Sequence, residues 1–158
     1  MAGNSDKLSS IDFCAVDLET TGVNPAFDKI VEIGAVRFRL DGGKICYQTL
    51  VNPGVPIPAN VIRIHGITDV MVADSPLLED VRDTFFSFLE GTVLVIQNPG
   101  FDLSFIDRAF RMDDVVIPDL NALDTVKLAK KYFTDLPNHK LSTLSSYLGL
   151  ELVSHRAL

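Results

Sequence analysis

The order of strand and helix signals predicts an α/β domain built on a mixed β-sheet. The chain begins with one apolar strand segment, continues with an antiparallel hairpin, and then alternates helices with strands. Hairpins make antiparallel neighbours and strand–helix–strand units make parallel ones, so one sheet with both kinds of pairing is expected. A length of 158 residues suits a single domain. We expect a polar N-terminal tail at 1–10 and one domain over 11–158.

Three strands are expected in the first third of the chain. Residues 11–17 form an apolar run that ends in an aspartate, which is typical of a buried strand, and residues 20–28 are rich in turn-forming types. Residues 30–40 and 44–51 carry strand-forming side chains, and the DGG sequence at 41–43 favours a tight turn between them. The second and third strands should therefore pair antiparallel.

Helices alternate with short strands in the rest of the chain. Three prolines predict a loop at 52–60. Ser75 followed by Pro76 is a typical helix start, and apolar residues then recur at helical spacing until Gly91. The later elements, in chain order, are a strand at 92–97, a helix at 101–112, a strand at 115–117, a helix at 124–133 capped by Asp124, and a helix at 140–148.

Composition excludes several classes of protein. Hydrophobic residues make up 47% and charged residues 22% of the chain, as in ordinary globular domains. No apolar run approaches the roughly 20 residues of a membrane span, and the polar first ten residues lack the apolar segment of a signal peptide. Cys14 and Cys46 form no metal-binding motif. We expect a cytoplasmic protein with no membrane partner.

An excess of acidic residues limits how the chain can bind nucleic acid. It has 14 Lys and Arg against 21 Asp and Glu, a net charge of −7. Proteins that hold nucleic acid by broad electrostatics carry a basic surface, so such a function must here depend on a small site where cations offset carboxylates. A solvated helix face best explains the one basic cluster, with strand steering or partner docking as alternatives. Its members are Lys127, Lys130, Lys131, His139 and Lys140.

A pair of carboxylates marks the end of the first predicted strand. Asp17 and Glu19 are two residues apart, so in extended chain they project from one face. Two like charges at the end of a buried strand are costly unless cations lie beside them. Mg²⁺ and Mn²⁺ prefer oxygen ligands and would remove that cost. Taken alone, the pair fits a solvated strand-to-turn junction better than a metal site.

Two further residues carry weaker signals. Asp102 lies where a predicted buried strand leads into a helix, and ligand sites gather at such junctions in α/β sheets. An aspartate near a helix start is also ordinary capping. His155 lies close to the end of the chain, where a lone histidine is more often a surface residue than a catalytic one.

In combination these motifs form a specific pattern. Asp17, Glu19, Asp102 and the sequence His155-Arg156-Ala157 resemble, in order and context, the DEDD 3′→5′ exonuclease superfamily, histidine subgroup, which includes the proofreading epsilon subunit of bacterial DNA polymerase III. Further stretches that resemble the family are VEIGAV at 31–36, IHGIT at 64–68 and HKLSTL at 139–144. The resemblance implies a ribonuclease H-like fold. That fold has a five-stranded mixed sheet of order 3-2-1-4-5, with strand 2 antiparallel and helices on its faces.

The resemblance also implies roles for individual residues. Asp17, Glu19 and Asp102 would hold two Mg²⁺ or Mn²⁺ ions, and His155 would be the general base that takes a proton from the attacking water. The substrate would be the 3′ end of single-stranded DNA, the product nucleoside 5′-monophosphates, and a DNA polymerase subunit an expected partner. The expected substrate contacts are Leu18, Thr20, Thr21 and His65, with Asn98 and Phe101 further candidates. A loop-capping role for His65 and a core role for Phe101 are the alternatives.

The sequence departs from the family pattern at two places. The pattern His-x-Ala-x-x-Asp is cut after Leu158, before its last aspartate, so we expect the final helix to be missing and this chain to be largely inactive. A version extended by about 20 residues should then be active, and equal Mg²⁺-dependent activity in both forms would contradict this expectation. Gln97 stands where relatives often have histidine, and Pro99 and Gly100 are unusual for that turn.

Two other functions remain open from the sequence. The first is an RNA-trimming exonuclease of the same superfamily, because contacts to the 2′-hydroxyl are not visible in one sequence. The second is a non-catalytic, polymerase-associated module, which the missing aspartate favours and the retained Asp17, Glu19, Asp102 and His155 oppose.

Overall fold

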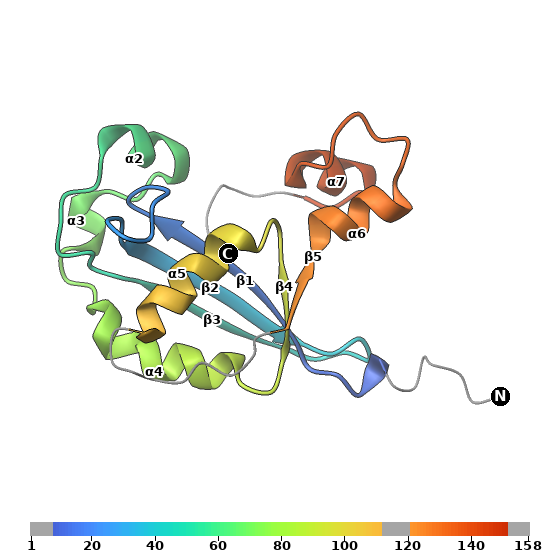
Figure 1. Cartoon of the computed structure of the whole chain (residues 1–158), viewed down its shortest axis with the longest axis horizontal. Helices are drawn as coiled ribbons and strands as arrows, with labels where there is room; N and C mark the ends of the chain where they lie inside the picture. Colours follow the sequence, from blue (N-terminus) through green and yellow to red (C-terminus); the bar gives the residue numbers. More distant parts are fainter. Residues whose placement is uncertain (1–7, 112–120, 152–158) are drawn as a thin grey trace.

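A computed structural model describes residues 8–111 and 121–151, and a five-stranded mixed sheet lies at its centre (Figure 1). The strand order is β3-β2-β1-β4-β5, with β1–β2 and β2–β3 antiparallel and β1–β4 and β4–β5 parallel. This confirms the predicted order and the antiparallel second strand. The strands are β1 Phe13–Thr20, β2 Ile30–Phe38, β3 Lys44–Leu50, β4 Val93–Ile96 and β5 Ala122–Asp124.

The first strand is longer than the sequence predicts. β1 continues to Thr20 because it pairs with β2 along its whole length, from Phe13 opposite Phe38 to Thr20 opposite Ile30. The register shifts between Glu19 and Thr20, so the carboxylates lie just before an irregularity in the ladder. Such shifts redirect side chains near functional sites. Asp17 and Glu19 are thus held within a paired strand rather than in a turn.

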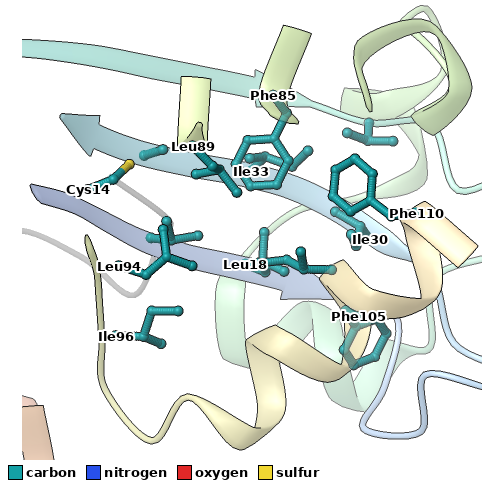
Figure 2. Packing of buried hydrophobic residues seen from close by; sticks show 14 residues of the cluster. Cys14, Leu18, Ile30, Ile33, Phe85, Leu89, Leu94, Ile96, Phe105 and Phe110 are labelled. Atoms are coloured by element: carbon teal, nitrogen blue, oxygen red, sulfur yellow. The ribbon is translucent and has the colours of Figure 1, made fainter. Parts of the chain in front are cut away.

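Helices α4 and α5 bury the main core against the sheet. Figure 2 shows Phe85 and Leu89 of α4 with Phe105 of α5 gathered over Leu18 and Leu94 of the strands. Burying a large apolar side chain contributes about 1.5–3 kcal/mol each. A smaller cluster joins Val31, Ile57, Ile67 and Val72. The helices are α2 Ala59–His65, α3 Asp69–Val72, α4 Leu78–Leu89, α5 Gly100–Arg111, α6 Thr125–Tyr132 and α7 Leu141–Tyr147.

Several sequence-based boundaries are wrong, and backbone pairing explains the main one. The predicted start of α4 at Ser75 is too early, because Leu77 is its N-cap and the Asp80 carboxylate accepts the Leu77 N–H at 3.0 Å. The Pro76 carbonyl accepts the Asn52 N–H at 2.9 Å, which holds this segment extended. The short helices α2 and α3 were not predicted.

The fifth strand of the described sheet is not the one that the sequence predicts. β5 is Ala122–Asp124, whereas the predicted strand at 115–117 lies outside the described residues. The predicted cap of the next helix is confirmed, because the Asp124 carboxylate accepts N–H groups of Val126 at 2.9 Å and Lys127 at 3.2 Å. None of the described helices is long and apolar enough to cross a membrane.

Candidate active site

A cleft of about 900 Å³ opens where β1, β4 and β5 meet helices α6 and α7. The carboxyl ends of neighbouring parallel strands meet at one sheet edge, which is where α/β proteins commonly bind ligands. α6 follows β5 directly, and α6 and α7 stand together beside that strand (Figure 1). The polar residues that line the cleft are Asp17, Glu19, Gln97, Asn98, Asp124, Lys127, Lys130, His139, Lys140 and Ser142.

Strand alternation places the two carboxylates of β1 on the cleft side of the sheet. Val16 and Leu18 are buried in the core beneath α4 and α5, so Asp17 and Glu19 project from the opposite face. Both line the cleft, as does Leu18 at the strand backbone. The predicted same-face arrangement of Asp17 and Glu19 is therefore present in the structure.

Asp102 approaches the same strand from α5. It lies in the first turn of that helix, is only 4% exposed, and accepts the backbone N–H of Leu18 at 3.2 Å. The pairing of β1 with β4 ends at Ala15 opposite Val95, so the Leu18 amide lies beyond the end of that ladder. The carboxylate thus takes the place that a neighbouring strand would otherwise occupy.

The electrostatics of the site reflect crowded carboxylates. Burial raises the pKa of Asp102 to about 7, with a further contribution from the charge of Asp17. Burial also raises the pKa of Asp17, and the charge of Glu32 adds to that shift. Glu32 is 0% exposed, lies opposite Glu19 on β2, and accepts a hydrogen bond from Gln48 at 3.1 Å. The surroundings of Asp17 and Asp102 therefore disfavour the ionised forms of both carboxyl groups unless a cation lies nearby.

This donor set fits a hard divalent cation such as Mg²⁺ or Mn²⁺. Asp17, Glu19 and Asp102 offer carboxylate oxygens, and a bound cation would offset the repulsion that raises the pKa of Asp102. Among residues 8–111 and 121–151, no three Asp, Glu, His or Cys side chains are placed so that they could together hold a metal ion. The carboxylates form an open acidic pocket, and their roles as metal ligands stay predictions. His155 lies outside the described residues.

The predicted substrate residues after Glu19 lie at the end of β1 and at the start of a well-anchored loop. Thr20 and Thr21 are buried, and the Thr21 hydroxyl accepts the Lys29 N–H at 3.0 Å while donating to the Asp28 carboxylate at 3.4 Å. Asp28 also accepts the Asn24 N–H at 2.8 Å. These bonds fold residues 21–29 back against the end of β1, next to the carboxylates.

Gly22 gives a test of this loop. A Cβ atom on Gly22 would lie 2.5 Å from the Asp28 carboxylate, so the Gly22→Ala variant must displace Asp28 and break its bonds to Thr21 and Asn24. We expect the variant to lose about 1–3 kcal/mol of unfolding free energy, measured by urea denaturation. Gly100→Ala is the matched control, because nothing lies within 4 Å of its added Cβ. Equal stability of the two variants would contradict this account.

The other predicted substrate residues occupy different surroundings. His65 ends α2, is 4% exposed, and its Nδ1 accepts the Ile67 N–H at 2.9 Å, so the neutral ring carries its proton on Nε2. Asn98 lines the cleft, and it is the one described residue other than glycine with a positive φ, at 61°. Phe101 packs against Phe105 with ring centroids 5.1 Å apart, at the edge of the core. Substrate contacts by these residues stay predictions.

The structure adds residues to the cleft that the sequence did not predict there. Asp124, Lys127, Lys130 and Lys140 line the same cleft as Asp17 and Glu19. Sequence reasoning assigned Asp124 only a capping role and favoured a solvated face for the lysines. No local motif signals such a placement, because it follows from the position of β5 beside β4.

Comparisons with known proteins identify the family of the chain. The model of the Exonuclease family matches residues 14–158. The chain is similar to the DNA polymerase III PolC-type protein of Caldanaerobacter subterraneus, 36% identical over 98% of this chain and 11% of that protein. It is also similar to the DNA polymerase III subunit epsilon-like protein of Rhodobacter capsulatus, 40% identical over 96% of this chain and 22% of that protein. The chain thus spans less than a quarter of the length of these relatives.

Solved structures show the same architecture. Exonuclease X in complex with 5′ overhanging duplex DNA is 27% identical with a TM-score of 0.68, over 89% of this chain and 75% of that one. E. coli Exonuclease I in complex with a dT13 oligonucleotide is 18% identical with a TM-score of 0.81, over 94% of this chain and 38% of that one. The fold is therefore the ribonuclease H-like fold of exonucleases. With the family match over residues 14–158, the chain belongs to the DEDD 3′→5′ exonuclease superfamily.

Proposed function

We propose that the chain carries the active site of a divalent-metal-dependent 3′→5′ exonuclease. It removes nucleotides from the 3′ end of single-stranded DNA and releases nucleoside 5′-monophosphates, in proofreading or repair. The observation that carries this proposal is the grouping of three carboxylates. Asp17 and Glu19 line one cleft, and Asp102 lies close enough for the charge of Asp17 to raise its pKa. DNA in the structures of Exonuclease X and Exonuclease I, and the polymerase relatives, support DNA as substrate.

The described residues prepare this pocket for hydrolysis. Asp17 and Glu19 present carboxylates from a paired strand, and Asp102 is fixed by the Leu18 amide, so the groups are positioned before substrate arrives. Divalent cations held by these carboxylates would activate water and stabilise charge on the phosphate. Asn98 lines the cleft where the terminal nucleotide would lie, and the loop at 21–29 follows β1, the strand that presents Asp17 and Glu19. His155 is the proposed acceptor of the proton from the attacking water.

Metal removal tests the proposed activity. We expect a 5′-labelled single-stranded DNA to shorten one nucleotide at a time from its 3′ end in Mg²⁺ or Mn²⁺, with no digestion in EDTA and recovery when metal is restored. Nucleoside 5′-monophosphates should be the products, identified by chromatography. The assay uses this chain beside the version extended by about 20 residues, and later variants are made in whichever form digests faster.

Three outcomes of this assay would overturn the proposal. They are equal digestion in EDTA, cleavage of circular single-stranded DNA, and release of nucleoside 3′-monophosphates. A matched RNA oligonucleotide, run side by side, separates a DNA enzyme from an RNA-trimming one. A chain that lacks activity and gains no melting temperature on Mn²⁺ titration would be a non-catalytic module, because bound metal stabilises the folded state.

A further inference from the structure

The lining that α6 and the start of α7 give to the cleft carries a concentration of positive charge. Four of the seven lysines in the sequence fall within residues 127–140. Three of them, Lys127, Lys130 and Lys140, line the same cleft as Asp17 and Glu19, and His139 lies between them. The fourth, Lys131, is exposed on the same helix but does not line the cleft. The basic wall, meaning Lys127, Lys130 and Lys140, is therefore part of the site rather than a general feature of α6.

The charges of the basic wall are only partly offset by neighbouring carboxylates. Arg37 and Arg39 both pair with Asp12, and Arg111 pairs with Asp107 at 2.7 Å. In the part of the chain that the structure describes, Lys130 and Lys140 form no ion pair with a carboxylate. Lys127 lies 3.8 Å from Asp124, and its side chain is 85% exposed. Exposed lysines in an acidic protein of net charge −7 form a local attractive field for an anion.

Hydrogen bonds hold the basic wall in place relative to the sheet. Gln97, just after β4, donates its amide to the His139 carbonyl at 3.4 Å. The His139 ring donates from Nε2 to the Phe133 carbonyl at 3.0 Å, which closes the segment between α6 and α7. Asp124 caps α6 at the end of β5. The segment that ends in Lys140 is thus tied to the strand ends that carry the acidic pocket.

We propose that Lys130 and Lys140 bind phosphates of the strand upstream of the nucleotide that is removed. This inference rests on the proposed function. It adds contacts to upstream phosphates, which a polynucleotide substrate has and a mononucleotide ester lacks. The scissile phosphate belongs at the carboxylates, so the next phosphates toward the 5′ end must leave the cleft past one of its walls. The basic wall is the one whose charge complements them, and lysine contacts to phosphates need no base sequence.

The test compares two substrates that differ in their upstream phosphates. Single-stranded dT12 has them, and the p-nitrophenyl ester of thymidine 5′-phosphate has none. In the double variant Lys130→Ala/Lys140→Ala, kcat/KM for dT12 relative to that for the ester should fall at least tenfold at about 50 mM salt. The slope of log KM for dT12 against log salt should become shallower by about 0.7 per lysine removed. Lys131→Ala, which removes one lysine charge outside the cleft, should leave both quantities unchanged.

Equilibrium binding separates this inference from the proposed function. Anisotropy of fluorescein-labelled dT12, measured in Ca²⁺, reports strand binding whether or not the chain hydrolyses it. Weaker binding by the double variant than by Lys131→Ala supports the basic wall even in a protein without activity. If the protein digests dT12 and the double variant matches Lys131→Ala in substrate ratio, salt slope and binding, the inference is wrong and the proposed function stands. Circular dichroism melting of all three proteins excludes loss of fold as the cause.

Discussion

Replacing Asp17 with Asn is expected to lower kcat for 3′-end digestion by at least 10²–10³-fold, the range seen when one preorganised polar group is lost from an active site. The amide keeps the size and the strand position of the side chain but cannot hold a cation by charge. The side chain of Asp17 is exposed on β1 and lines the cleft, so the variant should keep the fold. The measurement is single-turnover digestion of 5′-labelled DNA in Mg²⁺.

The control for this variant is Asp41→Asn, which makes the same chemical change in the exposed β2–β3 turn. It should digest DNA at the unsubstituted rate. Melting curves in EDTA should show Asp41→Asn at the unsubstituted melting temperature and Asp17→Asn no less stable, because the burial that raises the pKa of Asp17 disfavours its charged form. An Asp17→Asn protein that retains more than a tenth of the rate would remove Asp17 from the proposed catalytic set.

Asp102→Asn is expected to stabilise the metal-free protein while abolishing its activity. The folded-state pKa of Asp102 is about 7, well above the value of about 3.9 for an unfolded chain. The folded state therefore binds more protons than the unfolded state between these pH values, and the Asp102 contribution to stability falls as pH rises from about 4 to 7. Above pH 7 the full cost applies, on the order of 4 kcal/mol at most. Asn cannot ionise, and its side-chain oxygen can still accept the Leu18 N–H.

Urea denaturation in EDTA at several pH values measures this effect. The difference in unfolding free energy, variant minus unsubstituted protein, should be near zero at pH 4, grow through pH 5–7 and level off above pH 7. Mn²⁺ should then raise the melting temperature of the unsubstituted protein more than that of the variant, because the variant lacks one carboxylate. A variant that is less stable at pH 8 than the unsubstituted protein would contradict the electrostatic account. A substitution that raises stability and removes activity is typical of a residue whose side chain serves the active site at a cost in stability.

Much of the fold follows from local sequence signals. The DGG turn at 41–43 predicted the β2–β3 hairpin, and the alternation around Asp17 predicted that Asp17 and Glu19 share a face. The start of α4 was missed because the bond from Asn52 to the Pro76 carbonyl holds the segment extended, and a partner 24 residues away is invisible to a local pattern.

The site was predicted in part, and the missing part depends on tertiary structure. Asp17, Glu19 and Asp102 come from motifs with fixed spacing, and the structure brings them toward one pocket. Asp124 and the basic wall enter that pocket because β5 lies beside β4 and carries α6 with it. The environment of Glu32 was equally unpredictable, since its burial depends on pairing with β1 and on Gln48 of β3. The net negative charge of the chain gave no reason to place the lysines at a binding site, so a solvent-exposed helix face was the preferred prediction for them.

The unequal lengths of β1 and β4 have a consequence for any redesign of this domain. β4 stops pairing with β1 at Val95, and Asp102 accepts the Leu18 amide on the part of β1 that β4 leaves unpaired. Lengthening β4 by two residues would extend the ladder and gain backbone hydrogen bonds, yet it would compete with Asp102 of α5 for the Leu18 amide. A more regular sheet and a working exonuclease are therefore competing goals in this architecture, and a thermostabilised version should be sought in the helices instead.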